Sequence, residues 1–341
     1  MFTTKRVRGL AVAAIAVIGL PILAACSSGS GGGSTSGGDK VNIAYLTYIV
    51  TDYQNAAKRG MTSVIKGGGG KVTVFSANFD PQTQLSQCND AITSGRYNAI
   101  VISPIDPASA APCVKAADAA GIPVVTYETS VGTDPYSLKP QVPGVIAAIS
   151  TPLKTSTDGL GELMIAACGD ADPCRVVGEV ASGADVFSNQ IMDALAKKYG
   201  SKVDIVQRIA TGYDPAQVTT ALPDVLSAHP DVNVFVALTD STALAAVPTL
   251  KTAGLEKKVK LVGIGGSTEA VDAIKDGTLF GSLSNWPFQY GAAAAKALTQ
   301  SVKGEKVDPV GINMLTIDKP LLITPTTVDE FTPEWGATFT K

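Results

Sequence analysis

VNIAYL at residues 41–46 and VTVF at residues 72–75 are short, apolar and rich in β-branched residues, which is typical of buried strands. Between them, YQNAAKRGMTSVI at residues 53–65 has the apolar spacing of a helix, and GGGG at residues 67–70 ends that helix. A strand, a helix and a second strand in this order predict a βαβ unit with parallel strands.

The same alternation continues along the chain. Asp80-Pro81 and Asp214-Pro215 each predict a helix start, with an N-cap aspartate followed by proline at the first helical position. The further predicted strands are Ala99–Ile102, Pro123–Tyr127, Val176–Val180, Val203–Ile209, Val232–Leu238 and Val259–Ile264. The further predicted helices are Pro81–Ser94, Ala108–Ala120, Val186–Tyr199, Pro215–Ala228, Ser241–Ala253 and Thr268–Lys275.

The alternation is interrupted near residues 149–155, which divides it into two runs. Two runs of alternating strands and helices predict an α/β fold with two doubly wound parallel-sheet lobes. A (β/α)₈ barrel is the alternative that the number of strands allows. The interruption, together with late strands at Phe280–Ser284 and Ile312–Ile317, favours two lobes over one barrel.

The N-terminus has the layout of an export signal. Lys5, Arg6 and Arg8 precede the apolar segment Gly9–Leu23, which is too short for a comfortable membrane span. Leu23-Ala24-Ala25-Cys26 resembles the bacterial lipobox, and this resemblance implies cleavage after residue 25 and a lipid on Cys26. The alternative is a plain signal peptide with a chance cysteine. Residues 26–39 are rich in glycine and serine, which predicts a flexible tether between the anchor and the folded part.

Composition excludes several classes of function. The net charge is −3, and no basic block follows Arg8, so nucleic acid is a poor candidate partner. A single histidine, His229, argues against a zinc site. No cofactor is expected.

Four cysteines remain besides Cys26: Cys88, Cys113, Cys168 and Cys174. An even number in an exported chain favours disulfides over a metal site. Of the three possible pairings we favour Cys168–Cys174, which closes a short loop, and Cys88–Cys113, between successive helices. Buried free thiols are the alternative.

Five motifs resemble those of the ribose-type periplasmic binding proteins, the receptors of sugar ABC transporters. No single motif is decisive, but the order and spacing of all five over about residues 41–310 make the resemblance strong. The motifs are DPQTQLSQ (80–87), YNAIVISP (97–104), GIPVVT (121–126), AHPDV (228–232) and AVDAIKDG (270–277).

The resemblance implies two lobes joined by three crossover strands, with a solute trapped between them by hinge closure. It places residues 40–150 and 286–311 in an N-terminal lobe, and residues 151–285 and 312–341 in a C-terminal lobe. It also implies a membrane permease as the partner, and lobes that close freely suggest a monomer.

Candidate ligand-binding residues follow from the strand ends that match the family. In the N-terminal lobe they are Tyr48, Asp52, Tyr53 and Glu128. The tyrosines are expected to stack on a sugar ring and the acids to accept from hydroxyl groups. An alternative role for Asp52 is to cap the helix that follows it.

In the C-terminal lobe the candidates are Phe187, Asn189, Thr239, Asp240, Asn285 and Trp286. Trp286 is predicted to stack on the ligand, with hinge packing as the alternative. Where the family carries an Asp-Arg pair this chain has Glu128-Thr129, and a second family arginine, at the start of the helix at Val186–Tyr199, is also missing. We therefore expect a neutral sugar, modified sugar or polyol, held without the family's arginines.

Enzyme functions have weaker support. Gly263-Ile264-Gly265-Gly266 matches only part of a dinucleotide-binding fingerprint, and no Gly-x-Ser-x-Gly elbow lies in the folded region. An exported glycoside hydrolase, with two acids brought together by the fold, is the alternative from another class. A surface sensor for a less polar cyclic solute is a further alternative that uses the same binding chemistry.

Overall fold

The computed structural model describes residues 40–183, 185–307, 312–313 and 321–339. The predicted signal segment and the whole of the predicted tether, Cys26 included, lie outside these residues. Within the described part of the chain, no helix has the length and apolar character needed to cross a membrane.

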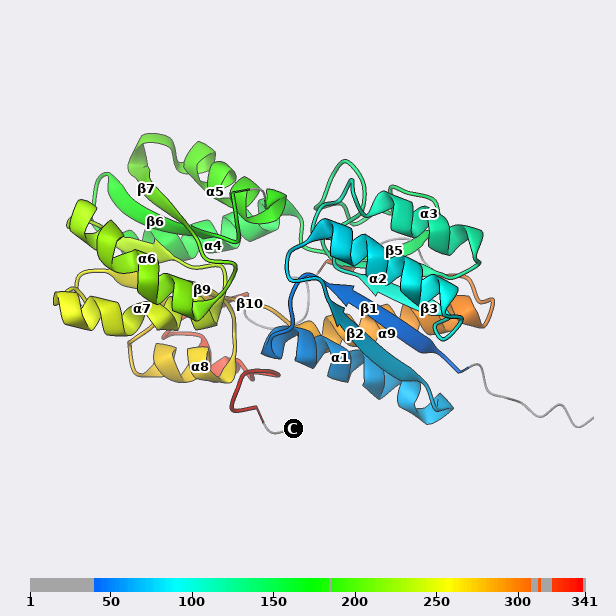
Figure 1. Ribbon diagram of the computed structural model, residues 1–341. Coiled ribbons are helices and arrows are strands. Elements are labelled where there is room, and N and C mark those ends of the chain that lie inside the picture. The colour runs from blue at the N-terminus through cyan, green and yellow to red at the C-terminus, as the bar shows by residue number, and fades with distance from the viewer. Residues whose placement is uncertain (1–39, 184, 308–311, 314–320, 340–341) are drawn as a thin grey trace, which may run out of the picture. The chain divides into compact units, whose positions relative to one another are not determined.

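The first sheet has the strand order β11-β5-β4-β3-β1-β2, and all of its neighbouring strands run parallel (Figure 1). Its strands are β1 (Asn42–Thr47), β2 (Lys71–Ser76), β3 (Ala99–Ile102), β4 (Val124–Glu128), β5 (Val145–Ser150) and β11 (Ile312–Asn313). The helices of this lobe are α1 (Asp52–Ile65), α2 (Pro81–Thr93), α3 (Ala111–Ala119) and α9 (Pro287–Val302).

The second sheet has the order β12-β10-β9-β8-β6-β7, and only β12 runs antiparallel to its neighbour. Its strands are β6 (Cys174–Val180), β7 (Val203–Ala210), β8 (Val234–Val236), β9 (Lys260–Gly265), β10 (Gly281–Ser284) and β12 (Leu322–Ile323). Its helices are α4 (Leu153–Cys168), α5 (Val186–Tyr199), α6 (Pro215–Ala228), α7 (Asp240–Ala253) and α8 (Thr268–Lys275).

Two separate parallel sheets confirm the predicted two-lobe α/β fold and exclude the barrel. The chain leaves the first sheet after β5 and returns to that lobe between β10 and α9. The expected third boundary, at residues 311/312, is wrong by at least two residues, because β11 pairs with β5 through Ile312↔Ile149 and Asn313↔Ser150. Both residues therefore belong to the first sheet.

Helices α1 and α9 pack closely in the first lobe (Figure 1). Gly60 and Gly291 face the contact. A Cβ added at Gly291 would lie 2.1 Å from the backbone oxygen of Ala57, and one added at Gly60 would lie 1.9 Å from that of Phe288. Only glycine permits this approach, because backbone atoms cannot move aside as a flexible side chain can.

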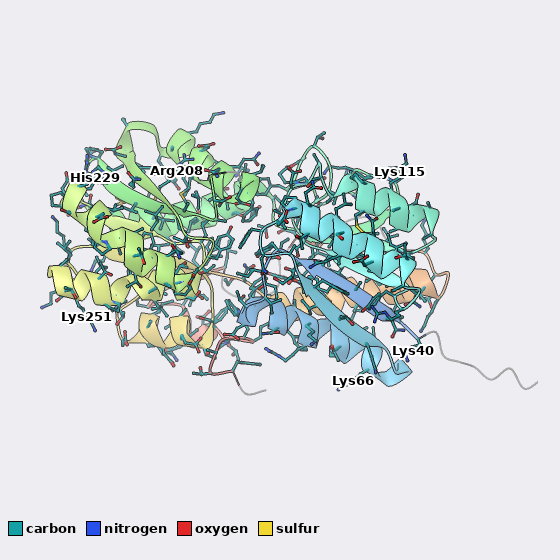
Figure 2. All side chains as sticks on the ribbon, viewed as in Figure 1. Lys40, Lys66, Lys115, Arg208, His229 and Lys251 are labelled. Carbon is teal, nitrogen blue, oxygen red and sulfur yellow. A yellow bond between two sulfur atoms is a disulfide. The ribbon has the colours of Figure 1, made fainter. Side chains whose placement is uncertain are left out.

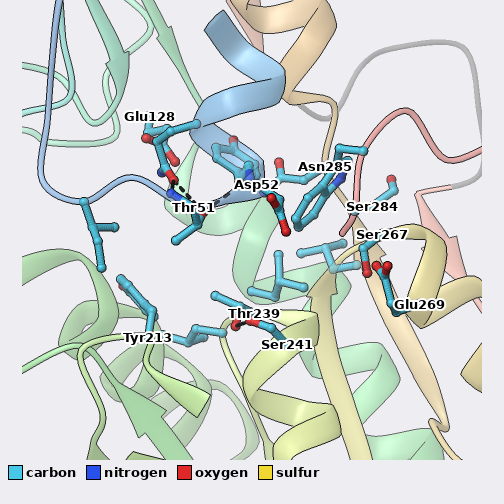
Figure 3. Close-up of a pocket in the computed structure, with 18 of the residues that line it drawn as sticks. Thr51, Asp52, Glu128, Tyr213, Thr239, Ser241, Ser267, Glu269, Ser284 and Asn285 are labelled. Carbon is cyan, nitrogen blue, oxygen red and sulfur yellow. Dashed lines mark hydrogen bonds between the residues drawn. The ribbon is translucent and has the colours of Figure 1, made fainter. Parts of the chain in front are cut away.

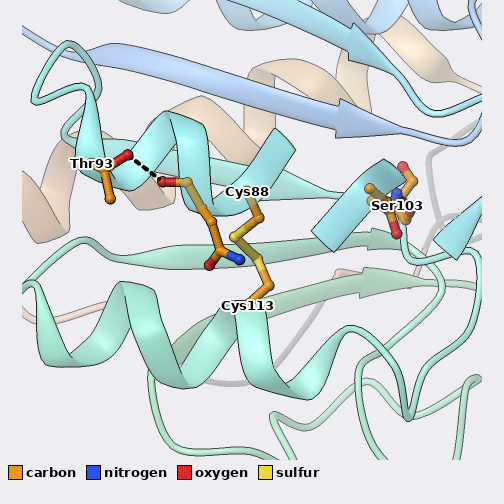
Figure 4. Close-up of a disulfide and its surroundings, with 6 residues drawn as sticks. Cys88, Thr93, Ser103 and Cys113 are labelled. Carbon is orange, nitrogen blue, oxygen red and sulfur yellow. Dashed lines mark hydrogen bonds between the residues drawn. A yellow bond between two sulfur atoms is a disulfide. The ribbon is translucent and has the colours of Figure 1, made fainter. Parts of the chain in front are cut away.

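The four cysteines of the folded part form the two pairs that we favoured. Cys88 in α2 and Cys113 in α3 are both fully buried, with their sulfur atoms 2.04 Å apart (Figure 4). The sulfur atoms of Cys168 and Cys174 lie 2.01 Å apart, between the end of α4 and the start of β6. The first pair fastens two successive helices, and the second closes the loop between a helix and a strand.

Candidate functional site

A cavity of about 260 Å³ is lined by residues that follow strands of both sheets. In parallel sheets the carboxyl ends of the strands lie at one edge, which is where ligands bind in folds of this class. Polar side chains from both lobes point into this cavity (Figure 3). The labelled ones are Thr51, Asp52, Glu128, Tyr213, Thr239, Ser241, Ser267, Glu269, Ser284 and Asn285.

The structure brings most of the predicted site residues together at this cavity. Those that line it are Tyr48, Asp52, Tyr53, Glu128, Phe187, Thr239 and Asn285. The helix-capping role considered for Asp52 belongs instead to Thr51, whose hydroxyl accepts from the backbone N–H of Tyr53 in a capping box with Gln54. Asp52 is the exposed first residue of α1, and its side chain lies at the cavity.

Asn189 was predicted to bind ligand but is not among the residues that line the cavity. Its amide donates to the carbonyl oxygens of Ser182 at 2.9 Å and Asp185 at 2.8 Å. Asn189 therefore fixes the loop that leads into α5 and, through that loop, the position of Phe187. Phe187 itself stacks on Tyr136, with ring centroids 5.5 Å apart.

Asp240 is the second predicted ligand residue that the structure places elsewhere. Its side chain is completely buried. One carboxylate oxygen accepts from the Ser282 hydroxyl at 2.6 Å, and the other accepts from the backbone N–H of Ser267 at 2.9 Å. Burial raises the pKa of this carboxyl, and these hydrogen bonds act in the opposite direction. Asp240 thus joins α7 to β10 and to the start of α8 beneath the cavity.

We expect Asp240→Ala to lower the free energy of unfolding by about 3 kcal/mol, because Ser282 and the Ser267 N–H would lose their buried acceptor. Asp272→Ala is the control, since Asp272 is exposed on α8, and it should change stability by less than about 0.5 kcal/mol. Urea unfolding of both variants measures the difference. Equal stability of the two variants would contradict the buried role.

Trp286 does not line the cavity, so the hinge-packing alternative is the correct one. Its indole is 1% exposed and packs against Phe331 with ring centroids 4.8 Å apart. The cavity wall carries the other tryptophan, Trp335. The Trp335 indole N–H donates to the carbonyl oxygen of Gly265 at 3.3 Å, and its ring meets Tyr53 edge-on at 5.5 Å.

The C-terminal segment 331–339, which carries Trp335, contacts both lobes. Arg59 of α1 donates to the backbone oxygen of Glu334 at 3.3 Å, and the Glu334 carboxylate accepts from the Phe288 N–H at 2.9 Å. On the other lobe, Glu269 of α8 accepts from the backbone N–H of Thr338 at 2.8 Å. The segment thus forms one wall of the cavity, and sequence reasoning had assigned it no functional residue.

Tyr213 is a further site residue that sequence reasoning missed. It follows β7, and its ring lies 6.2 Å from that of Tyr48. The buried carboxylate of Glu179 fixes the neighbouring strand ends, because it accepts from the Thr211 hydroxyl, from the Leu238 N–H at 2.7 Å and from the Thr242 hydroxyl at 2.6 Å. The signal was available in the sequence: an aromatic residue a few positions after the end of a predicted strand, as at Tyr48.

Glu128 has the most unusual environment in the cavity. Its backbone is left-handed, with φ of 64°, a conformation that is costly for a residue with a Cβ. Its carboxylate accepts from the Tyr48 hydroxyl at 3.1 Å and from the Ser103 hydroxyl at 3.1 Å. Burial raises the pKa of Glu128 to about 7, although the hydroxyl groups of Ser103 and Tyr48 act to lower it.

This pKa predicts a pH dependence of stability. A carboxyl with a raised pKa in the folded state favours folding below its unfolded pKa of about 4.3, and this contribution is lost as the pH rises through about 7. The free energy of unfolding of Glu128→Gln, relative to the parent, should therefore increase by about 3 kcal/mol between pH 4.5 and pH 7.5. Urea unfolding at a series of pH values measures it. A difference that does not change with pH would contradict the buried carboxyl.

The cavity offers hydrogen-bond acceptors and uncharged hydrogen-bond donors rather than cationic side chains. Among the described residues, its lining contains three carboxylates and no lysine, arginine or histidine. The labelled basic residues Lys66, Lys115, Arg208 and Lys251 instead lie at the outside of the lobes (Figure 2). Described residues also contain no cluster of acids, histidines and cysteines that is suited to a metal ion. Such a site suits an uncharged solute with several hydroxyl groups and an apolar face.

Comparison with known proteins agrees with this geometry. The model of the periplasmic binding protein domain matches residues 43–306. The xylitol-binding protein of Mycolicibacterium smegmatis is 28% identical over 306 residues, which cover 88% of this chain and 82% of that protein. The ribose import binding protein RbsB of Bacillus subtilis is 26% identical, with 77% of this chain and 80% of that protein covered.

A solved structure shares the fold. The ABC transporter solute-binding protein from Mycobacterium smegmatis with bound glycerol superposes with a TM-score of 0.72 at 23% identity, and the match covers 87% of this chain and 99% of that one. These relatives are solute-binding proteins and not enzymes. The hydrolase alternative considered from the sequence is therefore not supported.

Proposed function

Because the chain belongs to the periplasmic binding protein family, we propose that it is the lipid-anchored receptor of an ABC importer and captures a neutral sugar or polyol. The observation that carries the proposal is the cavity of about 260 Å³ between strand ends of two sheets, with hydroxyl, amide and carboxylate groups beside aromatic rings and no cation in its described lining. The names of the relatives support it, since one is a xylitol-binding protein and another is a ribose import binding protein.

The roles of the lining residues follow from their chemistry. Glu128, Asp52, Thr239 and Asn285 hydrogen-bond the hydroxyl groups of the solute, and Trp335 covers the apolar face of its carbon skeleton. Hydroxyl donors suit Glu128 because its two oxygens accept readily in a partly desolvated site. Both lobes contribute, so closure of the lobes around the solute completes the site.

A thermal-shift screen tests the binding proposal. The panel contains xylitol, D-ribose, D-allose, myo-inositol and glycerol, with lysine and glutamate as charged controls. A bound solute at about 100 times its dissociation constant should add about 2.7 kcal/mol to the free energy of unfolding. A neutral polyol or sugar is expected to raise the melting temperature, and the charged amino acids are expected to leave it unchanged. Stabilisation by the charged solutes alone would overturn the proposal.

The membrane anchor needs a separate experiment. We expect the parent chain to fractionate with membranes and the Cys26→Ser variant to lose the lipid, since two or three acyl chains hold a protein on a bilayer and none do so in the variant. Mass spectrometry of the N-terminal peptide identifies the lipid. Export also implies that the two cysteine pairs are oxidised. Because the two lobes must close freely, we expect the receptor to be a monomer. An unmodified Cys26 in the parent would contradict the anchor.

A further inference from the structure

A second, smaller cavity of about 60 Å³ adjoins the main one. The two cavities share Tyr48, Glu128, Phe187 and Tyr213 in their walls. The residues that line only the smaller one are Phe79, Pro104, Ile105, Pro107, Thr129, Asp185 and Val186. We call this space the side cavity. Because of the shared residues, a group attached to a solute in the main cavity can enter it.

The two carboxylates of the side cavity, Glu128 and Asp185, both accept hydrogen bonds from groups of the protein. Glu128 accepts from Tyr48 and Ser103. Asp185 accepts from the backbone N–H of Ser188 at 2.7 Å and from the Ser188 hydroxyl, as the N-cap of α5. The rest of the wall is mainly hydrocarbon and aromatic, and three of its rings (Tyr48, Phe79 and Tyr213) have centroids 5.3–6.2 Å apart. Apart from these carboxylates and Thr129, the surface open to a ligand is therefore mainly apolar.

The backbone around the side cavity is unusual. Among the described residues, four that are not glycine have left-handed backbone: Asn78, Phe79, Glu128 and Tyr213. Three of these line the side cavity, and Asn78 immediately precedes one of them. The three belong to different parts of the chain: Phe79 follows β2, Glu128 is the last residue of β4, and Tyr213 follows β7. Left-handed backbone at bulky residues is unfavourable and is concentrated at functional sites.

Exposed apolar side chains point to the same place. Among the described residues, only two large apolar side chains are exposed: Val186 at 36% and Val50 at 42%. Val186 lines the side cavity, and Val50 lies between Ile49 and Thr51, which line the main cavity. These side chains lack the cover that large apolar groups have in the rest of the fold.

We propose that the side cavity is a subsite for a small alkyl group, such as methyl, carried by the sugar or polyol in the main cavity. This inference rests on the proposed function, and it narrows the solute to a deoxy or methylated one. The volume accommodates a group of this size. An alkyl group would gain the contact of the aromatic rings, whereas a hydroxyl group there would exchange water for a wall that is mainly hydrocarbon and aromatic.

Matched solutes test the subsite by calorimetric titration. The pairs are D-fucose with D-galactose, L-rhamnose with L-mannose, and a mono-O-methyl myo-inositol with myo-inositol; 6-amino-6-deoxy-D-galactose supplies a cationic group. On each scaffold that binds, the methyl-bearing member should bind about fourfold tighter or more. Equal affinities, or tighter binding of the amine, would overturn the subsite. Failure of every solute to bind would overturn the proposed function, and the subsite with it.

Two variants test whether the preference for the methyl-bearing solute arises in the side cavity. Val186→Trp fills the side cavity from an exposed position and should remove the preference for the methyl-bearing member. Phe79→Asn removes the ring and introduces a residue type that tolerates left-handed backbone. It should also remove the preference for the methyl-bearing member. Val50→Trp, at the other exposed valine, should preserve it. A preference that survives in Val186→Trp and Phe79→Asn would place the methyl group elsewhere and overturn the proposal.

Discussion

A Glu128→Gly protein should be more stable than the parent and should bind its solute ten- to hundredfold more weakly. Glycine adopts the left-handed backbone at residue 128 without cost, and the change removes a carboxyl whose pKa is raised by burial. We expect a gain of about 1 kcal/mol in the free energy of unfolding at pH 7.5. The loss of affinity follows from the lost charge-assisted hydrogen bonds, which contribute about 1.5–3 kcal/mol each.

Asn78→Gly is the matched control for this result. Asn78 also has left-handed backbone, with φ of 50°, but it is exposed and lines neither cavity. The control should gain stability and keep the parent's affinity. Urea unfolding and calorimetric titration of the two variants give both quantities. If Glu128→Gly keeps the parent's affinity, Glu128 does not bind the solute.

Gly291→Val should yield little or no folded protein. A side chain at Gly291 would strike the backbone of Ala57 across the contact between α1 and α9. Separating the two helices would displace the start of α1, which carries Asp52 and Tyr53 into the main cavity. We expect a loss of at least about 4 kcal/mol, because overpacking against backbone cannot be relieved by a change of rotamer.

Circular dichroism and urea unfolding measure this loss. Gly67→Ala is the control, since nothing lies within 4 Å of the added Cβ, and it should fold with the parent's stability. A Gly291→Val protein that unfolds at the parent's urea concentration would show that the close approach of α1 and α9 is not required.

The regular alternation of strands and helices was predictable because each element carries its own signal. Helices α5, α6 and α8 begin and end at the predicted residues, where an acidic or hydroxyl N-cap precedes the first turn in each case. Strand β5 and helix α4 were not predicted. Helix α4 follows Pro152 without a side-chain cap and contains two glycines, so packing on the second sheet stabilises it rather than local propensity.

The site was predictable where it depends on strand ends. Tyr48, Glu128 and Thr239 each stand at or just after the end of a strand, and parallel strands bring such residues to one edge. The sequence does not say whether a polar side chain at this edge faces the cavity or the protein. Asp240 follows Thr239 directly, yet it turns inward to Ser282 and Ser267.

The two tryptophans show most clearly what the sequence alone does not predict about the site. Trp286 lies where the crossover approaches the cavity, but its indole turns into the hinge against Phe331. Trp335 is far from any predicted strand end, and it reaches the cavity because segment 331–339 is fastened to α1, α8 and α9. These contacts join residues more than 40 positions apart in the sequence: Glu334 contacts both Phe288 and Arg59. Local sequence patterns carry no information on them.

The central claim is that a sugar or polyol binds in the main cavity beside Trp335. Fluorescence titration of a Trp286→Phe protein tests it most directly, because Trp335 is then the only tryptophan left of two. With the solutes that raise the melting temperature, we expect a saturable change in Trp335 emission. A Trp335→Phe protein, which keeps Trp286, should show little or no change. A saturable change that comes from Trp286 alone, or no change from either tryptophan while the solute binds, would contradict the account.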